Sequence, residues 1–219
     1  MKKIVTILLS FLFISFQSVK AEGVAVGFTG ALHMFDADGT ETTRQSGQVN
    51  SGSHSENAVV PEVFLEALLD NGSAIGIAYI PTRDMGSESR SDTNSEGDTG
   101  TYKADAELDN VVQFYADINL PYDVYGASVY AKVGIQHATI VTLESLNSGS
   151  AYPDEEVLGY TLGLGAKGDL PYGNNLYYKA DVTYTNFEDY EANDTAGTGN
   201  KVVAELEDVA LKFSVGYKF

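Results

Sequence analysis

The chain contains no cysteine, and only 13 of its 219 residues are lysine or arginine. Without cysteine it can form neither a disulfide framework nor a thiolate metal site. The 31 acidic residues give a formal net charge of −18. A surface of that sign repels phosphate backbones, so we expect no nucleic-acid partner. Amphipathic helical stretches are also lacking, whereas tyrosine, phenylalanine and glycine are plentiful, and this composition predicts an all-β protein.

Long apolar runs are equally scarce, and the only one extends from Ile4 to Phe16 after two lysines. It is shorter than the roughly 20 residues of a membrane-spanning helix, which is the alternative interpretation. Small residues at Val19 and Ala21 supply a cleavage site. We therefore predict a cleaved signal peptide over residues 1–21 and one exported domain over residues 22–219. Removal of Lys2, Lys3 and Lys20 would take the formal charge from −18 to −21.

A hairpin-sized unit repeats along the exported part. Leu69, Leu120 and Leu170 are spaced 51 and then 50 residues apart, and each precedes a short segment with turn chemistry. These expected turns cover residues 70–73, 121–123 and 171–175. Four units of about fifty residues predict eight antiparallel strands.

The other connections are long, polar and acidic. They cover residues 36–57, 83–107, 142–156 and 186–207, and together contain 21 acidic and 5 basic residues. Compact soluble domains seldom carry four such loops at one end. Short turns at one end and long loops at the other are typical of an outer-membrane up-and-down β-barrel, which is the fold we predict.

Each expected strand has one apolar face. Expected outward residues include Val59, Val63, Leu65 and Leu69 in the second strand, and Leu108, Val112, Phe114 and Ala116 in the fourth. The opposite face of the sixth strand carries Gly159, Gly163 and Gly165. Small residues suit the narrow interior of an eight-stranded barrel, so we expect the apolar face to contact lipid. The alternative is a lipocalin-type barrel, apolar inside and polar outside.

Charged residues on the expected inner face must be paired, because an isolated buried charge is very costly. We predict interior pairs between three carboxylates and three lysines, namely Glu66, Asp117, Asp181, Lys132, Lys179 and Lys212. On the outer face, apolar residues alternate from Val209 to Phe219, and Glu205 and Glu207 follow. An apolar band about 25 Å tall needs about ten residues per tilted strand. We therefore expect Glu205 and Glu207 at the lipid boundary, where they attract divalent cations loosely or serve only solubility.

The leader, the eight alternating strands and the terminal "FSVGYKF" resemble small outer-membrane β-barrel proteins of the OmpX, opacity-protein and OmpA-barrel type. The most specific part is the last strand, whose outward residues are Leu211, Phe213, Val215, Tyr217 and Phe219. The resemblance implies that these residues form a signal for the barrel-assembly machinery. It further implies periplasmic chaperones, outer-membrane lipid or lipopolysaccharide as partners, and a monomer.

Motifs for chemistry are mostly missing. The glycine-rich residues 163–169 lack the GK[ST] ending of a phosphate loop. His33, His54 and His137 are too scattered to suggest zinc. We therefore expect no cofactor, metal or catalytic site. His137 and Thr139 share the outward face of the fifth strand and resemble the His-x-Ser pair of barrels that deacylate lipid A, but threonine is the weaker nucleophile.

We predict from these observations a non-enzymatic barrel that is plugged by its own side chains and displays acidic loops for adhesion, membrane integrity or surface interaction. The alternative function is a narrow passive porin-like channel. A deacylase-like barrel is the third.

Overall fold

In the computed structural model, residues 20–44, 46–93, 99–145, 151–171 and 175–219 are described, and all regular elements among them are β-strands. None of these residues forms a helix long and apolar enough to cross a membrane. Except for Lys20 and Ala21, the expected signal peptide lies outside the described residues, and so its cleavage stays a prediction.

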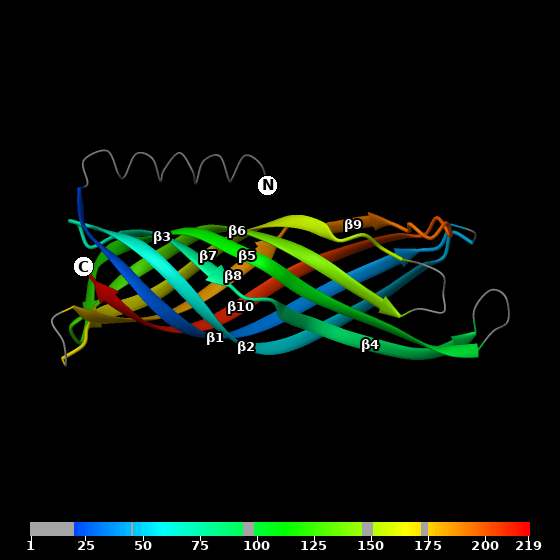
Figure 1. Ribbon diagram of the computed structural model, residues 1–219, viewed down its shortest axis with the longest axis horizontal. Coiled ribbons are helices and arrows are strands. Elements are labelled where there is room, and N and C mark those ends of the chain that lie inside the picture. Colours follow the sequence, from blue (N-terminus) through cyan, green and yellow to red (C-terminus); the bar gives the residue numbers. More distant parts are fainter. Residues whose placement is uncertain (1–19, 45, 94–98, 146–150, 172–174) are drawn as a thin grey trace.

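The strands form one antiparallel ring (Figure 1). Two of its eight positions are each occupied by two shorter strands in succession: β3 and β4 both pair with β5, and β8 and β9 both pair with β10. The ring closes where β1 pairs with β10 from Ala25↔Lys218 to Thr42↔Lys201. The predicted eight-stranded antiparallel barrel is thus confirmed. The strands are β1 (Ala21–Thr42), β2 (Val49–Leu69), β3 (Ala74–Ile80), β4 (Arg83–Thr93), β5 (Thr99–Val124), β6 (Ala127–Ser145), β7 (Glu155–Asp169), β8 (Leu176–Phe187), β9 (Tyr190–Asn193) and β10 (Lys201–Lys218).

The expected long loops are largely wrong, because strands occupy most of those stretches. β1 has 22 residues and β5 has 26, well above the usual strand length. We call the parts of the strands that occupy these expected loops the extension. In the part that belongs to β1, Asp36 and Asp38 point outward while Phe35 and Ala37 point inward. The period of two therefore continues, but with acidic, serine and threonine residues on the outer face where the lipid-facing part has apolar ones.

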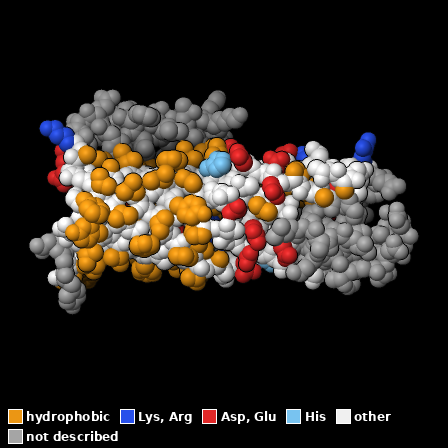
Figure 2. All heavy atoms as spheres, in the orientation of Figure 1, with side chains coloured by type: hydrophobic (Ala, Val, Ile, Leu, Met, Phe, Trp, Pro, Cys, Tyr) orange, Lys and Arg blue, Asp and Glu red, His pale blue; other side chains and the backbone are white. Residues whose placement is uncertain are grey.

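The barrel reverses its polarity along its axis. At the end of the barrel where the C-terminus lies (Figure 1), large apolar side chains are exposed on the outside, among them Phe28 (70%) and Phe213 (71%). Figure 2 shows these side chains gathered over one end of the visible face, with acidic side chains beyond them. In the extension the apolar side chains lie inside instead, in a buried cluster that includes Phe35, Leu108 and Phe187. The lipid-facing half thus has the predicted arrangement, and the extension has the lipocalin-type one.

Three local predictions are wrong. Leu108 is fully buried inside the barrel, because a bulge between Asp109 and Val112, with Asn110 at φ 51°, shifts the alternation by one residue. Leu69 is buried beside the turn that follows β2. The turn between β5 and β6 is made by Tyr125 and Gly126, both at positive φ, and not by residues 121–123.

Candidate functional site

The barrel interior in the lipid-facing half is the candidate site, because it contains most of the buried polar groups. The structure places all six charged residues predicted for the interior there, each at most 5% exposed. They come from five strands: Glu66 from β2, Asp117 from β5, Lys132 from β6, Lys179 and Asp181 from β8, and Lys212 from β10. Five of them meet in one cluster, and Lys212 belongs to a second.

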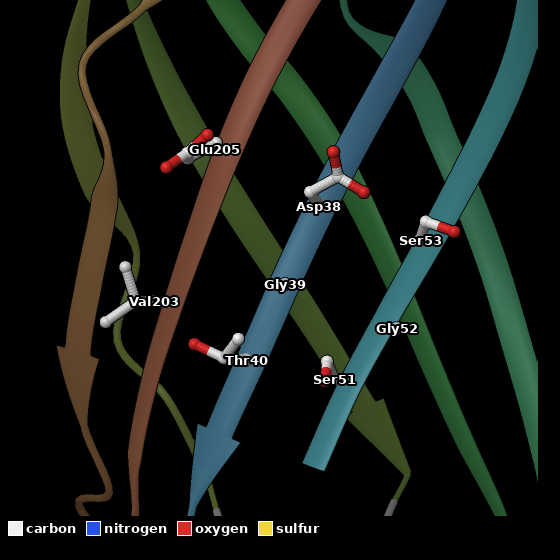
Figure 3. A pocket seen from close by; sticks show the side chains of 8 residues that line it. All are labelled: Asp38, Gly39, Thr40, Ser51, Gly52, Ser53, Val203 and Glu205. Carbon is white, nitrogen blue, oxygen red and sulfur yellow. The ribbon is translucent and has the colours of Figure 1, made fainter. Parts of the chain in front are cut away.

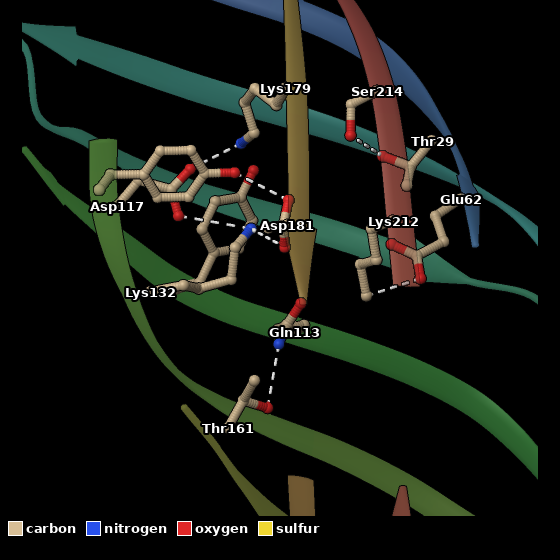
Figure 4. Close-up of polar contacts among 12 residues, drawn as sticks. Thr29, Glu62, Gln113, Asp117, Lys132, Thr161, Lys179, Asp181, Lys212 and Ser214 are labelled. Carbon is tan, nitrogen blue, oxygen red and sulfur yellow. Dashed lines mark hydrogen bonds and ion pairs between the residues drawn. The ribbon is translucent and has the colours of Figure 1, made fainter. Parts of the chain in front are cut away.

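The first cluster is a chain of ion pairs across the barrel (Figure 4). The Lys179 ammonium group contacts Glu66, and its Nζ lies 2.6 Å from Asp117 Oδ2. Lys132 Nζ lies 3.4 Å from Asp117 Oδ1 and 3.6 Å from Asp181 Oδ1. Asp117 thus bridges two lysines, and the chain of contacts links β2 to β8 through the centre of the barrel.

Three tyrosines complete this cluster by donating to its carboxylates. Tyr115 and Tyr177 donate to the two oxygens of Glu66 at 2.7 and 2.8 Å, and Tyr130 donates to Asp181 at 2.8 Å. The ammonium group of Lys132 also lies 4.2 Å from the centroid of the Tyr115 ring. These phenols satisfy carboxylate lone pairs that water would otherwise occupy, as a buried charge network requires.

Each of these aromatic rings lies over a glycine of the neighbouring strand. Tyr115 faces Gly76, Tyr130 faces Gly165 and Tyr177 faces Gly216 in the strand register. A methyl group added at any of these glycines would come within 2.3 to 2.5 Å of the ring carbons. The inner-face glycines therefore make room for rings that lean across the barrel, and this position brings the hydroxyls to the carboxylates.

The second cluster lies around His33 of β1. Its Nδ1 is 2.8 Å from Asp208 Oδ2 and its Nε2 is 3.1 Å from Glu62 Oε1. Lys212 Nζ is 2.7 Å from the same Glu62 oxygen. Both ring nitrogens therefore face carboxylate oxygens, and both contacts are hydrogen bonds when the imidazole carries two protons.

Arg83 adds a further buried cation near this second cluster. It is 3% exposed, and its guanidinium carbon lies 5.0 Å from the centroid of the Phe35 ring. Its three side-chain nitrogens have no hydrogen-bond partner among the described residues, and it interacts electrostatically with Asp208 and Glu62. The carboxylates of the second cluster are thus matched in charge by Lys212 and Arg83, without counting His33.

Uncharged polar side chains fill the space elsewhere. Gln113 and Gln136 each donate to Thr161, at 3.1 and 3.2 Å, and Gln136 also donates to Thr185 at 3.1 Å. Thr29 and Ser214 share a hydrogen bond of 2.8 Å. Beyond this level the buried apolar cluster follows. The polar groups of the described interior thus mostly bond to one another, and the interior of the extension is apolar.

Sequence reasoning missed several members of these clusters, although a signal for two of them was present. Glu62 has the same parity as Glu66 in β2, and His33 has the inward parity between Leu32 and Met34. Arg83 gave no such signal, because residues 83–107 were taken as a loop.

The expected cation rim is an open acidic surface. Glu205 and Glu207 are exposed and lie directly opposite Asp38 and Asp36 of β1. Asp38 and Glu205 line an open hollow of about 400 Å³ that is shared with β2 (Figure 3). The described residues contain no group of three or more side chains arranged to hold a metal ion. Loose cation attraction at this rim stays a prediction.

The His137 and Thr139 pair lies on the outer surface as expected. The structure adds a carboxylate, because Glu156 of β7 lies directly opposite Thr139 and its Oε2 is 3.4 Å from His137 Nε2. Among the described residues, no hydrogen bond joins His137 to Thr139. A histidine that activates a hydroxyl nucleophile lies within hydrogen-bond distance of it.

The expected assembly signal points outward: four of its residues lie on β10, and Phe219 directly follows that strand. Their exposed fractions are Leu211 39%, Phe213 71%, Val215 51%, Tyr217 44% and Phe219 75%. The rings of Tyr217 and Phe219 contact edge to face at 5.0 Å between centroids. The Phe219 amide donates to the Val24 carbonyl at 2.8 Å, so the last residue still contributes to barrel closure.

No protein-family model matches the chain, and no curated protein matches it. Solved structures do resemble it. The outer membrane protein OprG from Pseudomonas aeruginosa is 12% identical, with 91% of this chain and 97% of that chain covered and a TM-score of 0.54. Neisserial surface protein A (14% identical, 89% and 99% covered, TM-score 0.41) and the outer membrane protease OmpT from Escherichia coli (11%, 92% and 98%, 0.47) are also similar. At such identities the likeness shows the fold alone, which is that of small outer-membrane β-barrels.

Proposed function

We propose that this chain, which has the fold of the small outer-membrane β-barrel proteins, is a closed, non-enzymatic barrel of the outer membrane that displays a rigid acidic extension at the cell surface. The observation that carries the proposal is the filled interior. Ion pairs and hydrogen bonds fill the lipid-facing half, and apolar side chains fill the extension.

This interior argues against a passive channel. An ion that crossed the barrel would have to separate Lys179 from Asp117 and Lys132 from Asp181. Leaving one partner of a buried ion pair uncompensated costs about 3–5 kcal/mol. The ion would then have to lose its hydration in the apolar cluster around Phe35 and Leu108.

The extension is what the barrel displays. β1, β2 and β10 continue beyond the lipid-facing residues as paired strands, so their acidic side chains have fixed positions. Such a surface suits recognition or shielding at the cell surface better than a set of flexible loops does, because little conformational entropy is lost on binding.

Swelling of proteoliposomes tests the closed state. Vesicles that contain the refolded protein should swell in isotonic arabinose no faster than empty vesicles, while vesicles with a general porin should swell quickly. Swelling well above that of empty vesicles would favour the channel instead.

The lipid-modifying alternative has one observation in its favour, namely the carboxylate of Glu156 beside His137. We propose that these residues have no catalytic role, because the base and Thr139 do not contact each other. Mass analysis of lipid A from cells with and without the protein should give identical acylation patterns. Loss of one acyl chain that depends on His137 would show that the barrel is an enzyme.

A further inference from the structure

The wall between β2 and β3 ends at a pair of prolines. The ladder runs from Leu68↔Ala74 to Val63↔Tyr79 and stops there. If the same register continued, Pro61 would lie opposite Pro81, since each step along one strand is matched by one step along the other. Proline has no amide hydrogen to donate. Two prolines at one register position therefore end the ladder.

Beyond this point two strand edges remain without a ladder partner among the described residues. Residues 49–62 of β2, which we call the β2 edge, pair with β1 only, and β4 pairs with β5 only. A bulge at Gly86, with φ +125°, bends β4, and the His54 side chain lies against this glycine. The β1–β2 and β4–β5 hairpins then diverge towards their tips (Figure 1).

The position of the β2 edge along the barrel decides whether its unpaired backbone groups face lipid or water. The ladder ends at Tyr79, the last residue of the outward apolar series of β3, and Thr82 and Asp109 beyond it are hydrogen-bonded polar groups. An unpaired edge does not survive in hydrocarbon but is solvated in water. There it is a template for the addition of another strand.

The β2 edge has little protection against such an addition. Native edges are commonly blunted by lysine, proline or inward charges. Residues 49–62 contain no lysine or arginine, and their only proline, Pro61, and their fully inward carboxylate, Glu62, both lie at the base. Val59 is 82% exposed and Val49 60% exposed, so β-branched side chains are available on its outer face.

The charge around the β2 edge selects the partner. The exposed face of the β2 edge carries only uncharged residues, but the neighbouring strand β1 carries Asp36 and Asp38 on its exposed face. A partner strand would lie one strand away from these carboxylates, so long lysine or arginine side chains on alternate positions could reach across β2 towards them, and an acidic strand would be repelled.

We propose that the β2 edge binds an extended, basic segment of another protein by strand addition, with backbone hydrogen bonds for affinity and alternate basic side chains for selectivity. The inference deepens the proposed display function and rests on the extension lying outside the membrane. A conducting barrel would contradict the proposed function and leave the β2 edge in place, so the two can fail separately.

A fluorescent ten-residue peptide of alternating lysine and valine tests the inference by anisotropy, with the refolded full chain in detergent. The matched control is the same peptide with its backbone N-methylated at alternate residues, which keeps the charge but cannot form a ladder. We expect the N-methylated peptide, and a peptide of alternating glutamate and valine, to bind at least tenfold more weakly. Equal binding of the N-methylated peptide, or no binding of the unmodified one, would overturn the proposal.

A double variant locates the site. Pro61→Val with Pro81→Val restores two amide donors, so the β2–β3 ladder can continue and occupy the base of the β2 edge. We expect at least fivefold weaker peptide binding, whereas Pro121→Val near the far turn should leave it unchanged. Unchanged binding to the double variant would place the peptide elsewhere and overturn the assignment to the β2 edge.

Discussion

The Tyr130 ring of β6 lies directly over Gly165 of β7, and its hydroxyl reaches Asp181 of β8 at 2.8 Å. A methyl group at Gly165 would lie 2.5 Å from Tyr130 Cζ and 2.6 Å from Asp181 Cβ. Neither neighbour can give way without breaking the hydrogen bond between them. The glycine is therefore part of the interior network, although it has no side chain.

Gly165→Ala should accordingly destabilise the barrel. We expect a loss of about 1–3 kcal/mol in the free energy of unfolding, as for other overpacked interiors, measured by urea unfolding in lipid vesicles. Gly30→Ala is the matched control, because a methyl group there would meet nothing within 4 Å. Equal stability of the two variants would show that the ring does not depend on the glycine.

Lys179→Met should be among the most damaging single changes. It leaves Glu66 without its ammonium partner and removes one of the two lysines that contact Asp117, and an uncompensated buried charge costs about 3–5 kcal/mol. Lys201→Met is the control. It breaks an exposed ion pair, in which Lys201 Nζ lies 2.7 Å from Glu191 Oε2. That variant should lose about 0–1 kcal/mol. Similar losses in urea unfolding would mean that the interior pair is solvated.

The turn between β9 and β10 should respond to acid through Asp194. Slight burial raises the pKa of Asp194, but hydrogen bonds from the Ala151 amide and from Thr198 lower it more, so the pKa lies well below its ordinary value of 3.8. Because the folded value is the lower one, the carboxylate anchors the turn above about pH 3.8, and the anchor is lost as the pH falls through the folded value.

Nuclear magnetic resonance of the backbone amides can follow this anchor. The Thr198 amide, whose nitrogen is 2.6 Å from Asp194 Oδ2, should keep its chemical shift from pH 7 to about pH 4 and change only in stronger acid. Asp194→Asn should abolish that acid transition while leaving the barrel folded. A transition between pH 5 and 7 would contradict the assignment to this carboxylate.

Phe219→Ala should reduce the amount of protein in the outer membrane more than it reduces stability. The side chain is 75% exposed, so its loss removes only lipid contact and the edge-to-face contact with Tyr217. The hydrogen bond from the Phe219 amide to the Val24 carbonyl is retained. If the ring is read during assembly, much of the chain should fail to insert and be degraded in the periplasm. Phe28→Ala is the matched control, since Phe28 is 70% exposed on the lipid-facing surface but lies in the first strand. Equal membrane levels of both variants would show that Phe219 is an ordinary lipid-facing residue.

The alternation of residues was enough to predict the ring and the inward position of residues such as Asp117 and Lys179. It could not predict Leu108, because a bulge at Asn110 shifts the alternation and a single sequence carries no clear mark of it. The strand extensions were also missed, since aspartate and serine on the outer face look like loop composition when the apolar inner face is not separated from it.

The clusters depend on which residues face one another across the barrel, and alternation does not give that. Tyr177 and Glu66 are 111 residues apart, and their contact requires the register of several intervening strands. Pro61 and Pro81 are both visible in the sequence, but only the β2–β3 register shows that they fall opposite each other.

Single-channel recording in planar bilayers tests most directly whether the barrel is closed. The account predicts that the refolded protein inserts, as judged by its heat-modifiable mobility, yet gives no steady current in 1 M potassium chloride. Lys132 and Lys179 stay paired with carboxylates under these conditions, because buried pairs are screened by salt much less than exposed ones. A reproducible open-channel conductance from the wild-type protein would contradict the filled interior and with it the proposed function.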